Sequence, residues 1–223
     1  MTYDGQPPTE KNKYLLKDID YIKKRWNNRA DRWDSDLSDP SCHLNRKNSY
    51  KRFIDILSQE IYDSAICNGK YGFLDLGCGT GELLKVFADH FCWSCGIDIS
   101  PKMLEYAKNK SNDSTLLIEG DVFDPAVYPN GNIAVIAGRG VLLSHYGEKL
   151  AEQLLVILYN KLMPGGFIFL DAIQFNGINM PTEKKGYYDH ELKELAENAG
   201  FSSVVVYREE EYPLLFLKAS KNE

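Results

Sequence analysis

The spacing of hydrophobic positions changes along the chain near residue 70. Before that point apolar residues recur at helical spacing, most clearly over residues 49–66. One stripe of that stretch holds Phe53, Ile54, Leu57, Ile61 and Ala65. The polar stretch of residues 34–45, DSDLSDPSCHLN, interrupts the pattern and is typical of a loop. The pattern therefore predicts an N-terminal helical segment over residues 1–69.

Beyond residue 70 short apolar runs alternate with helical stretches. The runs predict strands over 71–77, 92–99, 115–121, 133–138 and 167–173, and a final strand pair over 202–210 and 212–221. The stretches between them predict helices over 81–91, 100–110, 148–166 and 189–201. Ser100 and Pro101 are typical of the start of a helix and Gly200 of its end. Residues 70–223 are thus expected to form an α/β core, with a mostly parallel sheet between two helical layers.

Composition narrows the class of protein. Hydrophobic residues make up 43% of the 223 residues, which is enough for a sizeable core. The formal net charge of −6 argues mildly against a dedicated nucleic-acid binder, which normally presents a basic face. No leader of signal-peptide type opens the chain, and no apolar run reaches the roughly 18 residues of a membrane span. We therefore expect a cytoplasmic protein that does not contact a membrane.

The cysteines do not form a metal-binding pattern. Cys92 and Cys95 have C-x-x-C spacing, but they fall on a predicted strand, where they point to opposite faces. A structural zinc site needs four ligands, usually from two spaced pairs. We predict no metal site.

Residues 75–83, DLGCGTGEL, form a glycine-rich turn directly after the first predicted strand of the core. A dinucleotide fingerprint requires a small residue at the position of Glu82, and a P-loop requires G-K-[ST]; neither is present. Asp75 and Glu82 would repel a pyrophosphate in a partly dry cleft. S-adenosylmethionine has no phosphate and carries a cationic sulfonium and an amino group, so nearby carboxylates suit it.

Four ordered blocks identify the chain as similar to a known family. FLDLGCGTGELL, CGIDISPKMLEYAK, LLIEGDVFD and LMPGGFIFLDAI together resemble the class I S-adenosylmethionine-dependent methyltransferases over about residues 71–218. The resemblance implies a Rossmann-like three-layer sandwich with a mostly parallel seven-stranded sheet, an antiparallel C-terminal strand and an N-terminal helical lid. It also implies S-adenosylmethionine as the cofactor.

The resemblance further implies which residues bind the cofactor. Asp75 would face its methionyl part, and the loop from Gly77 to Gly81 would wall the methionine and ribose. Asp98 would accept both ribose hydroxyls, since a carboxylate has the two acceptor oxygens that a diol needs. The remaining implied cofactor contacts are Cys78, Gly79, Ile99, Met103, Asp121, Val122, Ala137, Arg46 and Trp26. For Asp121 a plain loop cap, and for Met103 plain core packing, stay open as alternatives.

Substrate-facing groups of the family follow the fourth predicted strand of the core. Here that text contains Arg139 and His145, which we take as candidate catalytic residues. A histidine titrates near neutral pH and suits deprotonation of an oxygen or nitrogen acceptor. His145 could instead only orient the loop, and Arg139 could hold a carboxylate or form a salt bridge within the loop.

Aromatic residues supply the candidate substrate contacts. Residues 25–34, RWNNRADRWD, resemble the entry helix that covers the cofactor in many small-molecule members. The candidates are Trp33, Tyr21, Tyr146, Tyr187 and Tyr188, while Tyr50 is placed with Arg46 near the cofactor carboxylate. Ordinary helix packing or surface exposure is the alternative for these side chains.

The sequence predicts a small-molecule methyltransferase that acts on nitrogen or oxygen by in-line displacement. Residues 137–140 read AGRG rather than the NPPY or DPPY of DNA-base and glutamine methyltransferases. An RNA or protein methyltransferase and a non-catalytic cofactor-binding regulator remain alternatives. We expect a monomer or a homodimer.

Overall fold

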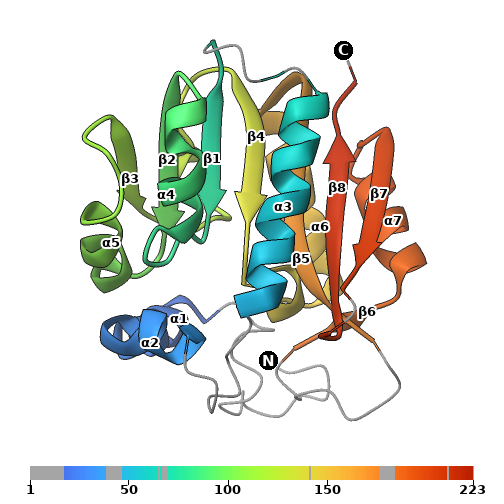
Figure 1. Ribbon diagram of the computed structural model, residues 1–223. Helices are drawn as coiled ribbons and strands as arrows, with labels where there is room; N and C mark the ends of the chain where they lie inside the picture. The colour runs from blue at the N-terminus through green and yellow to red at the C-terminus, as the bar shows by residue number, and fades with distance from the viewer. Residues whose placement is uncertain are drawn as a thin grey trace.

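The computed structural model describes residues 18–38, 47–64, 66, 70–140, 142–175, 184–209 and 211–222. Its centre is one sheet with the strand order β3-β2-β1-β4-β5-β8-β7, and a short β6 pairs with β5 (Figure 1). β8 runs antiparallel to both of its neighbours, and the other pairs are parallel. The strands are β1 (Gly72–Leu76), β2 (Trp93–Asp98), β3 (Thr115–Glu119), β4 (Ile133–Gly138), β5 (Leu162–Gln174), β6 (Gly186–Tyr187), β7 (Ser203–Arg208) and β8 (Leu214–Ser220). The predicted α/β class with an antiparallel C-terminal strand is confirmed.

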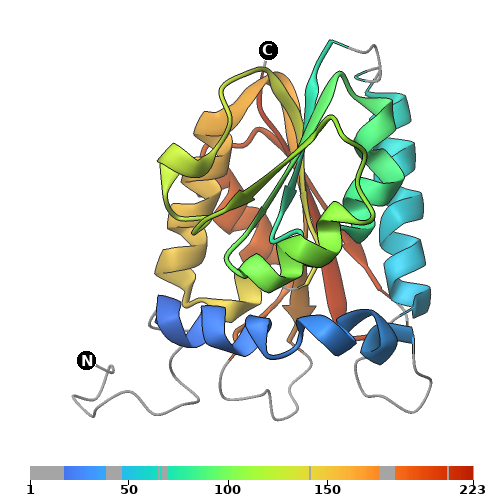
Figure 2. The same cartoon turned by 90° about the vertical axis from the view of Figure 1, so that its left-hand side faces the viewer.

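Helices cover both faces of the sheet (Figures 1 and 2). One face carries α3 (Lys47–Asp63), α4 (Glu82–Phe87) and α5 (Pro101–Lys108), and the other carries α6 (Glu148–Lys161) and α7 (Asp189–Asn198). The predicted start of α5 is confirmed, since the Ser100 hydroxyl accepts the Met103 N–H at 3.2 Å. Among the described residues, no helix is both long and apolar enough to cross a bilayer.

The predicted stripe of α3 packs on the sheet. Phe53, Leu57 and Ile61 are buried, and the Phe53 ring lies 4.7 Å from that of Phe169 and 5.3 Å from that of Phe216, measured between centroids. Ala65 lies outside the described residues. Although α3 falls in the segment predicted as an N-terminal cap, it forms part of a core layer, because its apolar stripe needs a sheet face to bury it.

The segment before α3 crosses the carboxyl end of the sheet. α1 (Ile19–Asn27), the 3₁₀ turn η2 (Ala30–Arg32) and α2 (Trp33–Ser38) run along this end, beside α5 (Figure 2). The prediction of a loop over residues 34–45 is wrong for residues 34–38, which belong to α2. Residues 39–45 lie outside the described part of the chain. In α2 the Ser38 hydroxyl donates to the Asp34 carbonyl at 2.7 Å, a local bond that satisfies a helix-end acceptor.

The helix predicted within residues 148–166, closed by a Pro-Gly-Gly turn at 164–166, ends slightly earlier than expected. α6 stops at Lys161, and Leu162 already has the extended ψ of 142° with which β5 begins. Pro164 explains the early stop, because a proline disfavours helical geometry in the residue before it and lacks an N–H. The short β6 was not predicted and adds an eighth strand to the sheet.

We predict that Phe53→Ala lowers the free energy of unfolding by about 3–5 kcal/mol, because it empties a fully buried site between two aromatic rings. Urea denaturation followed by circular dichroism measures the change. Tyr62→Ala on the same helix is the control, since Tyr62 is 78% exposed and its loss should cost no more than about 0.5 kcal/mol. Equal effects of the two variants would contradict the packing described here.

Candidate functional site

A pocket of about 780 Å³ lies between the carboxyl ends of β1, β2 and β4 and the helices α1 and α2. Strand order reverses at β1, which lies between β2 and β4, and such switch points are where open α/β sheets bind ligands. Of the predicted site residues, the pocket brings together Trp26, Trp33, Gly77, Cys78, Gly79, Asp98, Ile99, Met103, Asp121, Val122, Arg139, His145 and Tyr146.

The glycine turn after β1 is built on left-handed backbone. Gly77, Gly79 and Gly81 have φ values of +67°, +52° and +84°. A Cβ added at Gly77 would meet no atom within 4 Å, so a ligand can approach the backbone there. Gly81 differs, because its Cβ would lie 3.1 Å from Ala107 of α5, and it does not line the pocket. The expectation that Gly81 walls a ligand is therefore corrected: this glycine lets the loop pack against α5.

Asp98, the last residue of β2, fixes two turns at once. One carboxylate oxygen accepts the Gly79 N–H at 2.8 Å, and the other accepts the Ser100 N–H at 2.8 Å. Burial raises the pKa of Asp98 to about 6, and the backbone N–H groups oppose that rise. Asp98 also lines the pocket, and a carboxylate oxygen can accept more than one hydrogen bond.

Asp75 lies in β1 behind the glycine turn rather than on the pocket wall. It is 2% exposed, and its Oδ2 has no hydrogen-bond partner among the described residues. Burial, and then the charge of Asp98, raise the pKa of Asp75 well above its ordinary value. An unpartnered buried carboxylate oxygen is costly, and a cationic group of a ligand would relieve that cost.

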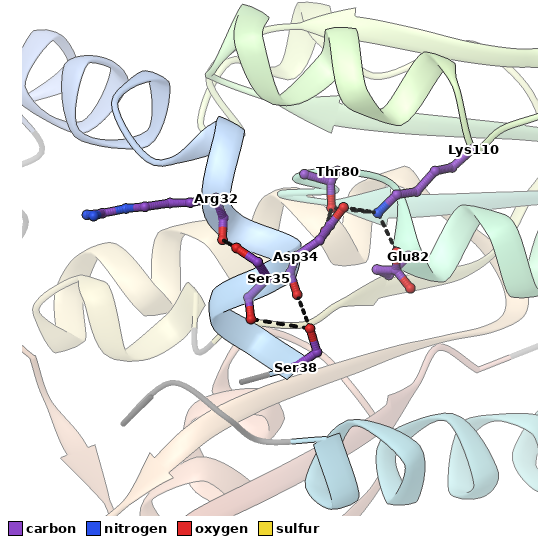
Figure 3. A network of polar contacts seen from close by, with 7 residues as sticks. All are labelled: Arg32, Asp34, Ser35, Ser38, Thr80, Glu82 and Lys110. Atoms are coloured by element: carbon purple, nitrogen blue, oxygen red, sulfur yellow. Dashed lines mark hydrogen bonds and ion pairs between the residues drawn. The ribbon is translucent and has the colours of Figure 1, made fainter. Parts of the chain in front are cut away.

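Glu82 is not the open carboxylate that the sequence suggested. The Lys110 ammonium forms an ion pair with Glu82, bonds Asp34 Oδ2 at 2.6 Å and lies 3.2 Å from Thr80 Oγ1 (Figure 3). The Thr80 hydroxyl donates to Asp34 Oδ1 at 2.6 Å. The charge of Glu82 is thus largely matched by that of Lys110.

The wall beyond β2 and β3 is mostly apolar. Met103 is 2% exposed, Val122 is 7% exposed and Ile99 is half-buried, and all three line the pocket. Asp121 Oδ1 accepts the Phe123 N–H at 3.0 Å, so this residue does cap its turn while it also lines the pocket. A flat apolar ring with a polar edge fits such a wall.

Arg139 is occupied by a buried ion pair. Its guanidinium bonds Asp171 of β5, lies 3.3 Å from the Ser49 hydroxyl and stands 5.6 Å from the centre of the Tyr50 ring. Asp171 also accepts the Gly140 N–H at 2.9 Å. This geometry favours the salt-bridge alternative over a catalytic role, because the charge of Arg139 already has a buried partner that holds the loop after β4.

His145 ends the 3₁₀ turn η5 (Leu142–His145) and faces the pocket. It is 5% exposed, and its ring lies 6.2 Å from that of Trp26. Burial, followed by the charges of Lys184 and Arg25, lowers the pKa of His145 well below its ordinary value, and a backbone hydrogen bond at Gly140 opposes this. The imidazole is therefore neutral at physiological pH, the form that can accept a proton.

Aromatic rings form one side of the pocket. Trp26 of α1 and Trp33 of α2 meet edge to face with 5.2 Å between ring centres, and Arg29 lies over both rings at 5.8 and 5.7 Å. Tyr146 is buried edge to face against Phe123 at 4.8 Å. These contacts fix the rings, so they form a firm roof.

Several predicted residues lie away from the pocket. Tyr187 is 1% exposed in the core, where its hydroxyl donates to the Leu143 carbonyl at 3.3 Å, and Tyr188 is 47% exposed beside His190. Ala137 is fully buried within β4, and the half-buried Tyr21 is absent from the lining. Tyr187 and Tyr188 are corrected to packing and surface residues because β6 ties their segment to the edge of β5. Arg46 lies outside the described residues.

Other lining residues were missed in the sequence. They include Arg25, Arg29, Asp34, Thr80, Leu142 and Lys184. Asp34 and Arg29 stand within the quoted stretch RWNNRADRWD, but no local pattern tells which of its polar residues face inward. Lys184 lies in a bend and Leu142 begins the short 3₁₀ turn η5, so neither belongs to a periodic pattern.

Comparisons with known proteins agree with this geometry. Residues 73–166 match the family described as "Methyltransferase domain". The uncharacterized protein MJ1252 of Methanocaldococcus jannaschii is 37% identical over 75 residues, which are 34% of this chain. The match spans only 27% of that relative's length.

Solved structures share the fold over most of the chain. Magnesium protoporphyrin IX methyltransferase from Synechocystis with bound S-adenosylmethionine superposes with a TM-score of 0.71 at 18% identity, over 92% of this chain and 97% of that one. The DhpI complex with S-adenosylhomocysteine gives a TM-score of 0.66 at 15% identity, over 92% and 97%. At such identities the likeness shows the fold, and the domain match is confined to residues 73–166. The chain therefore has the fold of S-adenosylmethionine-dependent methyltransferases, and its residues 73–166 match a methyltransferase domain.

Proposed function

We propose that this chain transfers a methyl group from S-adenosylmethionine to a nitrogen or oxygen of a small-molecule metabolite. The observation that carries the proposal is the pocket of about 780 Å³ that α1 and α2 roof over, with a neutral buried histidine on its wall. When bound, the cofactor supplies an electrophilic methyl group on a sulfonium. The chain's own residues bind, orient and shield the two reactants.

The donor half of the pocket fits S-adenosylmethionine. In our proposal Asp98, which the Gly79 and Ser100 N–H groups hold in place, accepts the ribose hydroxyls. The open space at Gly77 admits the ligand to the backbone, and Asp75, behind that turn, faces the methionyl part directly or through water. The adenine lies against Ile99, Met103 and Val122, with Asp121 at its polar edge.

On the acceptor side we assign His145 as the general base. Its place on the pocket wall supports a role beside the acceptor, where a neutral ring offers a lone pair to the leaving proton. Trp26, Trp33 and Tyr146 exclude water from the site, which strengthens the electrostatic interactions within it. Arg139 has no proposed catalytic role, since its guanidinium pairs with Asp171.

A small acceptor fits the roofed pocket better than a macromolecule does. A polymer would need an open approach to the methyl group, whereas the N-terminal helices cross that approach. One structural neighbour is named as a methyltransferase of magnesium protoporphyrin IX, which is a small molecule. A small-molecule acceptor for this chain is consistent with that name. A cytoplasmic location and a monomeric or homodimeric state remain predictions.

We predict that cofactor affinity falls as the pH drops through about 6, because the Asp98 carboxylate must be ionised to accept two hydroxyl groups. A single group of this kind raises the dissociation constant of S-adenosylhomocysteine roughly tenfold at about pH 5 relative to pH 7.5. Calorimetric titration over this pH range measures the effect.

The Asp98→Asn variant is the control, with affinity about 1–3 kcal/mol weaker and less dependent on pH. Protonation of Asp98 does not weaken cofactor binding by unfolding the protein. Its pKa is raised on folding, from 3.8 to about 6, so its protonation stabilises the fold as the pH falls from 6 toward 4. A flat affinity in the wild type would contradict the role given to Asp98.

We predict that the protein transfers the labelled methyl group of S-adenosylmethionine to a component of a cell's small-metabolite fraction and not to its RNA or protein fraction. With that component His145→Gln should lower kcat about 100-fold while changing cofactor affinity less than about twofold. Tyr188→Phe, at an exposed residue outside the pocket, is the matched control and should keep wild-type kcat. Label in the RNA or protein fraction, or full activity of the histidine variant, would overturn the proposal.

A further inference from the structure

Three segments that are distant in sequence meet at the ammonium group of Lys110. Lys110 follows α5, where its N–H donates to the Ala107 carbonyl at 3.0 Å. Its side chain reaches Asp34 of α2, Thr80 in the glycine turn and Glu82 at the start of α4 (Figure 3). An ammonium has three donors, and here each donor has an oxygen to bond.

The charges of this cluster make Lys110 indispensable to it. Asp34 and Glu82 are both acidic, and both approach the same ammonium from different segments. With Lys110 present the cluster carries one net negative charge. Without Lys110 the carboxylates of Asp34 and Glu82 would repel each other, and this repulsion would separate α2 from the glycine turn. The Lys110 side chain is 21% exposed, so solvent screens this interaction only in part.

The cluster sits directly beside the pocket wall. Asp34, Thr80 and Glu82 all line the pocket, and Thr80 is 2% exposed between the two glycines. Trp33 precedes Asp34, and its indole nitrogen is the nearest atom to a Cβ placed on Gly79, at 3.9 Å. Holding Asp34 therefore holds the Trp33 ring over the loop on which the cofactor rests.

The other end of the roof is attached to the same helix. The Ser100 hydroxyl donates to Asn27 Oδ1 at 2.7 Å at the start of α5, while Lys110 acts just beyond its end. α5 is thus a platform that fixes α1 at one end and α2 at the other. The hydrogen bond at Asn27 joins neutral groups, whereas Lys110 forms ion pairs. Removing the Lys110 charge would leave two carboxylates that repel each other, and no such repulsion would arise at Asn27.

We propose that Lys110 is a positioning residue that holds α2 against the glycine turn and so sets the dissociation rate of the cofactor. It touches neither the reacting atoms nor the pocket. It acts through Asp34, Thr80 and Glu82, which form the wall. The inference rests on the methyl donor of the proposed function and is independent of the acceptor and of His145.

The test compares Lys110→Met and Lys110→Arg with the wild type. Lys110→Met should release S-adenosylhomocysteine roughly fivefold faster in stopped-flow tryptophan fluorescence, the effect of losing two partly exposed ionic contacts, with little change in the association rate. Lys110→Arg should stay near wild type, because it keeps the charge. Without any ligand, the backbone amides of α2 should exchange hydrogen faster in the methionine variant.

A second substitution distinguishes the loss of the Lys110 contacts from a general loss of folding stability. Glu82→Gln added to Lys110→Met removes the uncompensated repulsion and should recover part of the lost residence time. Lys218→Met is the matched control: Lys218 is 19% exposed, pairs with Glu60 and lies off the pocket, so its loss should leave cofactor release unchanged.

Equal release rates in the wild type and Lys110→Met would overturn the proposal, as would equal losses in the methionine and arginine variants. If Lys110→Met does not fold, Asp34→Asn breaks the same ion pair without altering α5 and decides in the same way. Failure of the wild type itself to bind the cofactor would count against the methyl donor instead.

Discussion

The site depends on one buried carboxylate at the end of β2. Asp98 accepts an N–H from the glycine turn after β1 and another from the turn that starts α5. The parallel sheet brings these turns to the same edge, and this pair of bonds joins them through one side chain. Because both oxygens hold a backbone donor, the carboxylate is oriented before any ligand arrives, and orientation in advance lowers the cost of binding.

The same edge also explains the choice of ligand. Asp75 and Asp98 lie close enough that the charge of Asp98 adds to the burial that raises the pKa of Asp75. A phosphate would meet two buried acids there, whereas a ligand with an ammonium and a diol would match them. The roof of α1 and α2 then adds what a bare sheet edge lacks, namely aromatic surface over the loop and a barrier to water.

Much of this architecture follows from local sequence patterns. Alternating strands and helices, the Ser100 cap and the glycine turn are local features, and sequence alone places them well. Side-chain partners are harder to predict, because Arg139 meets Asp171, and Glu82 meets Lys110, across segments that only the folded sheet brings together. Tyr187 was misplaced for the same reason, since the two-residue β6 has no periodicity to reveal it. Gly81 followed the family pattern in sequence, yet its packing against Ala107 is a tertiary contact.

The central claim is that this glycine turn and its two acids bind S-adenosylmethionine rather than a phosphate-bearing dinucleotide. Thermal unfolding of the protein titrated with S-adenosylmethionine, S-adenosylhomocysteine and NAD tests it most directly. The account predicts a rise in Tm that saturates with either sulfur compound and no rise with NAD. Stabilisation by NAD with none from the sulfur compounds would contradict it.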